Sequence, residues 1–231
     1  MKPITTALCS YGMSGHVFHA PFISINPKFN LYGVFERTKN EAQKNYPNIK
    51  TFRSLESMLA DDAIELVIVN TPNITHYDFA KKVITAGKHM VIEKPFTATV
   101  AEAEELIALA KEKNVIISVY HNRRYDSDFK TVQKVLNENL LGDIVEAEFH
   151  YDRFDPVLSY KIHKETPTAG VGSLYDLGSH LIDQAVQLFG MPKAVNADLD
   201  TFRPNSKVGD YFDVKLFYPN QRVILKSSYY V

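Results

Sequence analysis

Lys94 is the first side chain whose type and position point to chemistry. It lies in the segment Glu93-Lys94-Pro95, directly after an apolar run, His89–Ile92, that is typical of a strand. A lysine at the carboxyl end of a strand can polarise a carbonyl group or stabilise a developing alkoxide, and Pro95 fixes the turn that aims it. A surface lysine without such a role is the alternative interpretation.

An imidazole and two carboxylates follow in the second half of the chain. Asp176, His180 and Asp183 are spaced i, i+4 and i+7, so an α-helix would place them within roughly 60° of one another, among apolar neighbours. An imidazole with an ordinary pKa of roughly 6.5 suits a general base that takes a hydroxyl proton, and Asp176 could orient it. A helix cap at Asp176 and a buried core histidine at His180 are the alternatives.

A zinc site is the rival chemistry for these residues. His180 has no second histidine on its helix face, and Cys9 is the only cysteine of the chain, so the ligand set that zinc prefers is not provided. We therefore expect no metal. A single cysteine also excludes an intramolecular disulfide and fits a reducing compartment.

The charge balance argues against polyanionic partners. The 26 basic and 27 acidic residues nearly cancel, so no positive field draws in nucleic acid or an anionic membrane surface. The N-terminal residues lack the apolar core of a signal peptide, and no apolar stretch approaches the roughly 20 residues that span a bilayer. We expect a soluble, cytoplasmic protein.

The elements that must position these side chains follow two patterns. Up to Tyr120, apolar runs alternate with segments of helical period such as Ala101–Lys113, which indicates a parallel sheet covered on both faces. The predicted strands are Ile4–Cys9, Leu31–Phe35, Leu66–Asn70, His89–Ile92 and Val115–Val119. The second half predicts helices at Ser127–Asn139 and Tyr175–Phe189, a loop at Thr166–Gly172, and strands at Val145–Asp152, Ala194–Phe202, Tyr211–Tyr218 and Arg222–Tyr230. The last three strands could form an antiparallel meander.

The turn after the first strand suggests a dinucleotide site. Ser10-Tyr11-Gly12-Met13-Ser14-Gly15 matches the last two glycines of Gly-x-Gly-x-x-Gly. Gly12 would let the backbone approach a pyrophosphate and Gly15 would let the helix pack on the strand, whereas Ser10 should strain the turn. The predicted contacts are Tyr11, Gly12, Met13, Ser14 and Gly15; a glycine turn without a ligand is the alternative.

Polar residues at two further strand ends extend this predicted site. Glu36 could accept from the 2′-hydroxyl of NAD, whereas Arg37 and Thr38 could hold the 2′-phosphate of NADP. Guanidinium pairs strongly with phosphate, which favours NADP, although the charge of Glu36 argues for NAD and Arg37 could be a plain surface arginine. The third strand adds Asn70, Thr71, Pro72, Asn73 and His76 at the same edge of the sheet. No Gly-x-x-x-x-Gly-Lys-Ser/Thr motif is present, so NTP hydrolysis is not supported.

Four separated segments together resemble the Gfo/Idh/MocA oxidoreductases. They are Tyr11–Gly15 with Phe18–Pro21, Glu93-Lys94-Pro95, Tyr120–Phe129 and Tyr175–Gln184. The last two are most similar to the branch of NADP-dependent scyllo-inositol 2-dehydrogenases. The resemblance implies an α/β fold, with a doubly wound Rossmann domain at 1–121 and an α/β domain with an open, mostly antiparallel sheet at 122–231. The family continues beyond residue 231, so we expect the second domain to be incomplete here.

The resemblance also implies an activity and its residues. It implies an NAD(P)-dependent dehydrogenase that acts on a CH–OH group of a sugar or cyclic polyol and assembles as a homodimer or homotetramer through the C-terminal sheet. Lys94, Asp176 and His180 match catalytic positions; Lys94, Asn122, His180 and Asp183 would meet the substrate; Glu93, Lys94, Asn122 and Arg123 would lie near the cofactor. A dinucleotide-binding sensor or partner protein without turnover is the alternative.

Overall fold

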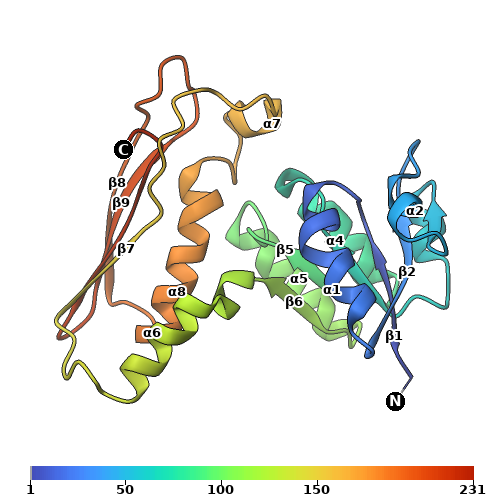
Figure 1. The fold of residues 1–231 in the computed structure, drawn as a ribbon, viewed down its shortest axis with the longest axis horizontal. Coiled ribbons are helices and arrows are strands. Elements are labelled where there is room, and N and C mark those ends of the chain that lie inside the picture. The colour runs from blue at the N-terminus through green and yellow to red at the C-terminus, as the bar shows by residue number, and fades with distance from the viewer. Residues whose placement is uncertain (1) are drawn as a thin grey trace. The chain divides into compact units, whose positions relative to one another are not determined.

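The computed structural model describes residues 2–231, which fold as two compact units that meet in the chain between Tyr120 and His121 (Figure 1). The first unit is built on a six-stranded sheet of order β3-β2-β1-β4-β5-β6, in which every pair is parallel. Its strands are β1 (Ile4–Leu8), β2 (Phe29–Phe35), β3 (Lys50–Phe52), β4 (Leu66–Val69), β5 (His89–Glu93) and β6 (Ile117–Tyr120). This is the strand order of a Rossmann fold, and the prediction of a parallel sheet is confirmed.

Both faces of this sheet are buried, as the apolar strands predicted. In β4, Val67 and Val69 belong to one apolar core and Ile68 to the core on the opposite face, because successive side chains of a strand point to opposite sides. The covering helices are α1 (Ala20–Ile25), α2 (Glu41–Asn45), α3 (Leu55–Leu59), α4 (His76–Thr85) and α5 (Val100–Glu112), with a π-helical turn η1 (Gly15–His19) and a 3₁₀ turn η2 (Asn73–Thr75).

Strand β3 was not predicted from the sequence. A three-residue strand is too short to show alternation, and it is placed by pairing with Gly33, Val34 and Phe35 at the edge of the sheet. This short strand matters because Arg53, the residue that follows it, supports the loop after β2.

The second unit has a four-stranded sheet of order β7-β10-β9-β8. β8 (Ala194–Asp200), β9 (Tyr211–Phe217) and β10 (Arg222–Ser228) form the predicted antiparallel meander, and β7 (Glu146–His150) pairs parallel to β10. The helical segments are η3 (Asn122–Tyr125), α6 (Ser127–Asn137), α7 (Ile162–Glu165), η4 (Leu174–Gly178) and α8 (Ser179–Phe189). Leu181 and Ala185 of α8 pack on the inward residues of β9 and β10, which form the core of this unit.

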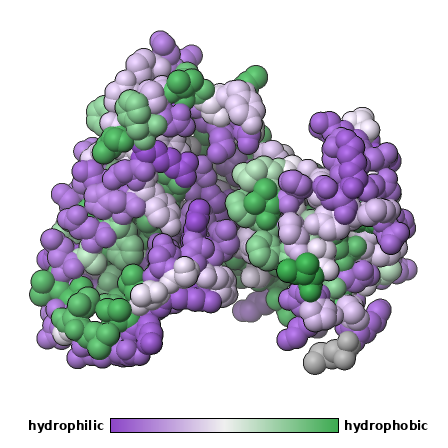
Figure 2. All heavy atoms as spheres, in the orientation of Figure 1, coloured by the Kyte–Doolittle hydropathy of each residue, from purple (hydrophilic) through white to green (hydrophobic). Residues whose placement is uncertain are grey.

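Some apolar side chains of the second unit stay exposed. Leu140, Leu141 and Val145 lie on the connection from α6 to β7, each more than 60% exposed. Figure 2 shows a green patch at the lower left, over this part of the unit. Across residues 2–231, no helix combines the length and the apolar character that crossing a bilayer would demand.

Candidate functional site

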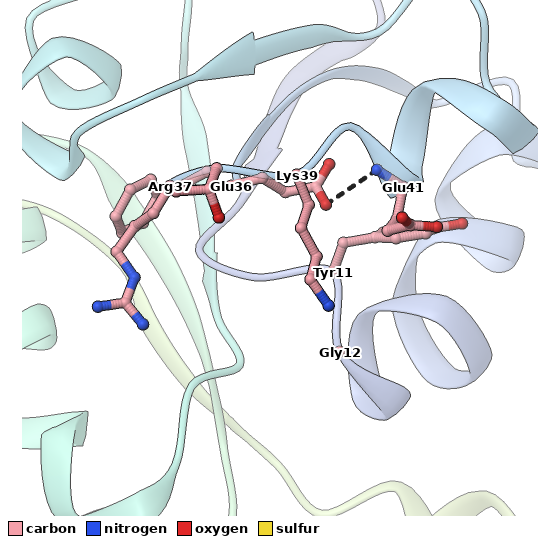
Figure 3. A pocket seen from close by; sticks show the side chains of 8 residues that line it. Tyr11, Gly12, Glu36, Arg37, Lys39 and Glu41 are labelled. Atoms are coloured by element: carbon pink, nitrogen blue, oxygen red, sulfur yellow. Dashed lines mark hydrogen bonds between the residues drawn. The ribbon is translucent and has the colours of Figure 1, made fainter.

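The glycine turn and the end of β2 line one pocket of about 290 Å³ in the first unit (Figure 3). It is lined by Tyr11, Gly12, Phe35, Glu36, Arg37, Thr38, Lys39 and Glu41. Four predicted cofactor residues and Gly12 therefore share one cavity at the carboxyl edge of the sheet, where ligands bind in open α/β folds.

The two glycines have the environments that a phosphate-binding turn requires. A Cβ built on Gly12 meets no atom within 4 Å, so the backbone faces open space that a ligand can fill. A Cβ on Gly15 would lie 2.5 Å from the backbone oxygen of Ser10, so only glycine allows this close packing. These residues fit a bound dinucleotide.

Ser10 is not strained, contrary to our expectation. Among the described residues the non-glycine positions with positive φ are Asn114, Asn139 and Asn205, and Ser10 is not one of them. Asn70 holds the turn instead: its Oδ1 accepts from Ser10 N (3.0 Å), its Nδ2 donates to Ser10 O (2.9 Å), and its carbonyl accepts from Ser10 Oγ (2.9 Å). Asn70, predicted to contact the cofactor, thus supports the turn through both side-chain polar atoms.

Glu36 also has a task that the sequence did not reveal. Its two carboxylate oxygens accept from the backbone N–H groups of Glu41 and Ala42, both over 3.1 Å, at the start of α2. Figure 3 shows the Glu36 carboxylate directed at Glu41. The charge of Glu36 is thus partly compensated by the positive end of a helix, which weakens its repulsion of a phosphate.

The loop after β2 carries cationic side chains, and hydrogen bonds from Arg53 support its backbone. Arg37 and Lys39 line the pocket, and in the view of Figure 3 Lys39 extends toward the turn that contains Gly12. Arg53 Nη1 donates to the carbonyls of Glu36 (2.9 Å) and Lys39 (2.6 Å). Lys39 and Arg53 were missed because neither belongs to a motif, although Lys39 continues the polar run that begins at Glu36 and could have been noticed.

The residues after β4 support the site from within. His76 is 1% exposed, with Nδ1 2.8 Å from the carbonyl of Pro95 and Nε2 3.0 Å from that of Thr71. Burial lowers the pKa of His76, and the hydrogen bonds to the two carbonyls oppose that shift. His76 thus joins two loops, and its place near the cofactor stays a prediction. Thr71 Oγ1 accepts from Thr75, and Asn73 begins η2.

Lys94 follows β5 as predicted, with a cis peptide bond to Pro95. Its neighbour Glu93, predicted near the cofactor, accepts from Ser14 Oγ (2.5 Å) and lies 2.8 Å from His19 Nε2. His19 was not singled out, because a histidine that partners a residue 74 positions away leaves no local signal. The predicted catalytic lysine is therefore adjacent to a buried polar cluster.

In the second unit the predicted histidine helix begins with a π turn. η4 covers Leu174–Gly178 and α8 begins at Ser179, so the α-helical spacing that we used for Asp176 and His180 does not hold across this joint. Gly178 permits close packing here, since an added Cβ would lie 2.9 Å from Leu174 Cδ1 and 3.3 Å from Phe212 Cζ. His180 is 7% exposed, which agrees with the predicted buried setting.

Each carboxylate of this segment has a cationic partner. Asp176 Oδ2 accepts from Lys164 Nζ (3.2 Å), and Asp183 takes a two-pronged contact from Arg124, with Nε 2.7 Å from Oδ2. Arg124 was not assigned this role because the pair is 59 residues apart. A substrate contact by Asp183 stays a prediction, as does one by Asn122, which begins η3.

The segment that carries Lys164 is anchored by buried charges. Arg203, with its side chain 4% exposed, pairs with Asp210 (3.0 Å) and with Glu165 (3.2 Å) of α7.

Arg123, predicted near the cofactor, pairs with Asp126 (2.9 Å). Among the side chains that the structure describes, no group of three His, Cys, Asp or Glu is arranged to hold a metal ion.

Comparison with known proteins assigns the fold to a family. Residues 4–121 match the family model described as an oxidoreductase family with an NAD-binding Rossmann fold, and residues 129–231 match the GFO/IDH/MocA C-terminal domain. The chain belongs to the Gfo/Idh/MocA oxidoreductase family. The resemblance read from its motifs is confirmed.

Relatives within the family include proteins named as dehydrogenases. IolW of Bacillus subtilis, a scyllo-inositol 2-dehydrogenase (NADP⁺), is 42% identical over 96% of this chain and 62% of its own length. Levoglucosan dehydrogenase of Pseudarthrobacter phenanthrenivorans is 32% identical over 71% of this chain and 43% of its own. The crystal structure of the oxidoreductase yvaA of Bacillus subtilis has a TM-score of 0.92 at 41% identity, covering 99% of this chain and 64% of that one. The chain thus spans less than two thirds of the length of these relatives.

Proposed function

We propose that this chain belongs to an NADP-dependent dehydrogenase that moves a hydride between the nicotinamide and a CH–OH group of a cyclic polyol or sugar. The pocket of about 290 Å³ carries this proposal, because it joins the open glycine turn to the cationic loop after β2. IolW, a relative at 42% identity, is NADP-dependent and acts on scyllo-inositol, which is consistent with this pocket chemistry.

The preference for NADP follows from the charges around that pocket. Arg37 and Lys39 supply two cations, whereas the carboxylate of Glu36 is directed at the backbone of α2. A 2′-phosphate between such groups gains charge-assisted hydrogen bonds that a 2′-hydroxyl cannot match. Thr38 adds a hydroxyl donor at the same edge.

The cofactor preference is tested with the double variant Arg37→Ala/Lys39→Ala. We expect the Kd for NADPH, measured by nicotinamide fluorescence, to rise about tenfold or more, since a hydrogen bond to a charged group is worth about 1.5–3 kcal/mol. The Kd for NADH should change little. Lys82→Ala is the matched control, because Lys82 is an exposed lysine that pairs with Glu56, and neither residue lines the pocket. Equal losses for both cofactors would contradict the assignment.

The proton chemistry is assigned to Lys94, Asp176 and His180. The nicotinamide, when bound, supplies the hydride acceptor, so the protein has to remove only the hydroxyl proton. We assign that proton to His180, whose imidazole is buried, with Asp176 as the group that orients it. The ammonium of Lys94 stabilises the substrate oxygen as its charge develops.

The substrate class is tested with a panel of inositols and aldoses, with NADP⁺ and NAD⁺ in parallel. We expect a rise in absorbance at 340 nm with at least one cyclic polyol, and Lys94→Met should abolish it while leaving the Kd for NADPH near the wild-type value. Tight NADPH binding without turnover on any member of the panel would instead favour a sensor or partner protein.

We propose a homodimer or homotetramer that forms through the sheet of the second unit. Strand β8 is exposed at all seven positions, with Val195 60% and Leu199 54% exposed, so its edge can pair or pack with another copy. Light scattering after size exclusion should give two or four chain masses for the wild type. Val195→Lys should shift the mass toward one chain; a monomeric wild type would contradict the proposal.

A further inference from the structure

Two side chains around the glycine turn converge on one carboxylate oxygen. Ser14 Oγ donates to Glu93 Oε1, and His19 Nε2 lies 2.8 Å from the same oxygen. The side chains of His19 and Glu93 are 4% and 14% exposed, so this cluster is shielded from water. Hydrogen bonds to an ionised acceptor are roughly twice as strong as neutral ones.

The π turn is what allows this convergence. Residues five apart in an α-helix lie about 140° apart around the axis, so Ser14 and His19 would point to different sides. In η1 the N–H of Ala20 bonds to the carbonyl of Gly15, which is the i to i+5 step of a π-helix. Such a step brings residues that are five apart, such as Ser14 and His19, closer to the same side of the helix. The widened turn therefore has a visible consequence, since it aims both donors at Glu93.

Glu93 connects the turn to the strand that carries the predicted catalytic lysine. It is the last residue of β5 and precedes Lys94. Burial opposes ionisation of Glu93, but the hydrogen bonds from His19 and Ser14 outweigh it and hold the pKa of this carboxyl below its ordinary range. The His19 ring also packs on Tyr120 at the end of β6, with centroids 4.5 Å apart. The turn is thus fixed to the carboxyl ends of two strands.

We infer that His19 and Ser14, acting through Glu93, are positioning residues that hold the glycine turn and the Lys94 segment in one geometry. The inference rests on the proposed function, because it takes the ligand of the turn to be a nicotinamide dinucleotide. A displaced turn would present its backbone N–H groups to the pyrophosphate at the wrong angle. Loss of the hydrogen bonds to Glu93 would also let the end of β5, and Lys94 with it, move. We therefore expect both weaker cofactor binding and a lower kcat.

The test compares His19→Leu, which removes the donor, with His19→Gln, which places an amide N–H near the position of Nε2. The Kd for NADPH is measured by fluorescence without polyol, and kcat is measured with cofactor and polyol saturating. His19→Leu should raise the Kd about tenfold or more and lower kcat, and His19→Gln should restore most of both. The matched control is His89→Gln at the opposite end of β5, where Nδ1 accepts from Ile116 N (3.0 Å); it should behave as wild type.

A wild-type Kd and kcat in His19→Leu would overturn the inference. Equal losses in His19→Leu and His19→Gln would also overturn it, because the donor would then be irrelevant. If His19→Leu does not fold, Ser14→Ala decides: it removes one donor and should raise the Kd severalfold at an unchanged Tm. A wild-type chain that binds neither NADPH nor NADH contradicts the proposed function itself, whereas normal binding by wild type and all variants contradicts the inference alone.

Discussion

An added methyl group should lower the stability of the fold at Gly15 and weaken cofactor binding at Gly12, two glycines of the same turn. In Gly15→Ala the new Cβ would lie 2.5 Å from Ser10 O and 2.9 Å from Asn70 Nδ2, two atoms that are hydrogen-bonded to each other. Relieving that overlap must move backbone as well as side chain, and overpacking of this kind costs about 1–3 kcal/mol. For a unit of this size, we expect Tm to fall by roughly 3–10 °C.

Gly12→Ala should have the opposite profile. Its Cβ meets nothing within 4 Å and the residue is not in the left-handed region, so Tm should stay unchanged or rise slightly. The methyl group would occupy the space where a pyrophosphate approaches. Loss of one hydrogen bond to a charged group costs about 1.5–3 kcal/mol, or roughly 10- to 150-fold in Kd.

Differential scanning fluorimetry and NADPH fluorescence titration measure the two quantities on the same samples. The reasoning is refuted if Gly12→Ala binds NADPH as wild type does, or if Gly15→Ala keeps the wild-type Tm. Either result would mean that the turn does not have the role that its geometry indicates.

Three further predictions concern groups outside the pocket chemistry. Burial raises the pKa of the Cys9 thiol, so Cys9 should react with DTNB at pH 8 only as the chain unfolds; immediate reaction would contradict its burial. Burial opposes ionisation of Glu93, but the hydrogen bonds from His19 and Ser14 hold its pKa in the folded chain below the ordinary value of 4.5. The ionised carboxylate therefore stabilises the folded chain fully above pH 4.5, and this stabilisation is lost as the pH falls through the lowered pKa of the folded chain. Urea unfolding from pH 7 to 3 should therefore show wild type approaching Glu93→Gln, and a constant gap would argue against the cluster. Asp183→Asn should lower the free energy of unfolding by about 1 kcal/mol, since the side chain of Arg124 is 39% exposed and keeps water as a partner. A coupling energy of zero in a double-mutant cycle with Arg124→Ala would show that the pair does not stabilise the fold.

The sequence predicted what depends on local pattern. Apolar runs separated by helical segments predicted the parallel sheet, and the two fingerprint glycines predicted a turn whose open and crowded sides the structure shows at Gly12 and Gly15. The strands of the meander were found to within two residues. The family was recognised from four short motifs in the right order, and each motif is itself a local pattern of residues.

What the sequence could not predict depends on contacts between distant residues. Glu36 was predicted to accept from a ribose hydroxyl, and nothing in the sequence indicated that both its oxygens also accept from the start of α2. Ser10 looked strained, but Asn70, 60 residues away, supplies the hydrogen bonds that a serine turn needs. The π turns at η1 and η4 were not predicted, and at η4 an α-helical period was assumed where a five-residue step occurs.

The most direct measurement is hydride transfer itself. A cyclic polyol deuterated at its carbinol carbons is incubated with this chain and NADP⁺, and the reduced cofactor is analysed by mass spectrometry. We predict reduced cofactor that carries one deuterium in place of one hydrogen, formed faster with NADP⁺ than with NAD⁺ and absent in the Lys94→Met variant. Saturable NADPH binding with no deuterated cofactor from any polyol or sugar of the panel would contradict the proposal that this chain transfers hydride.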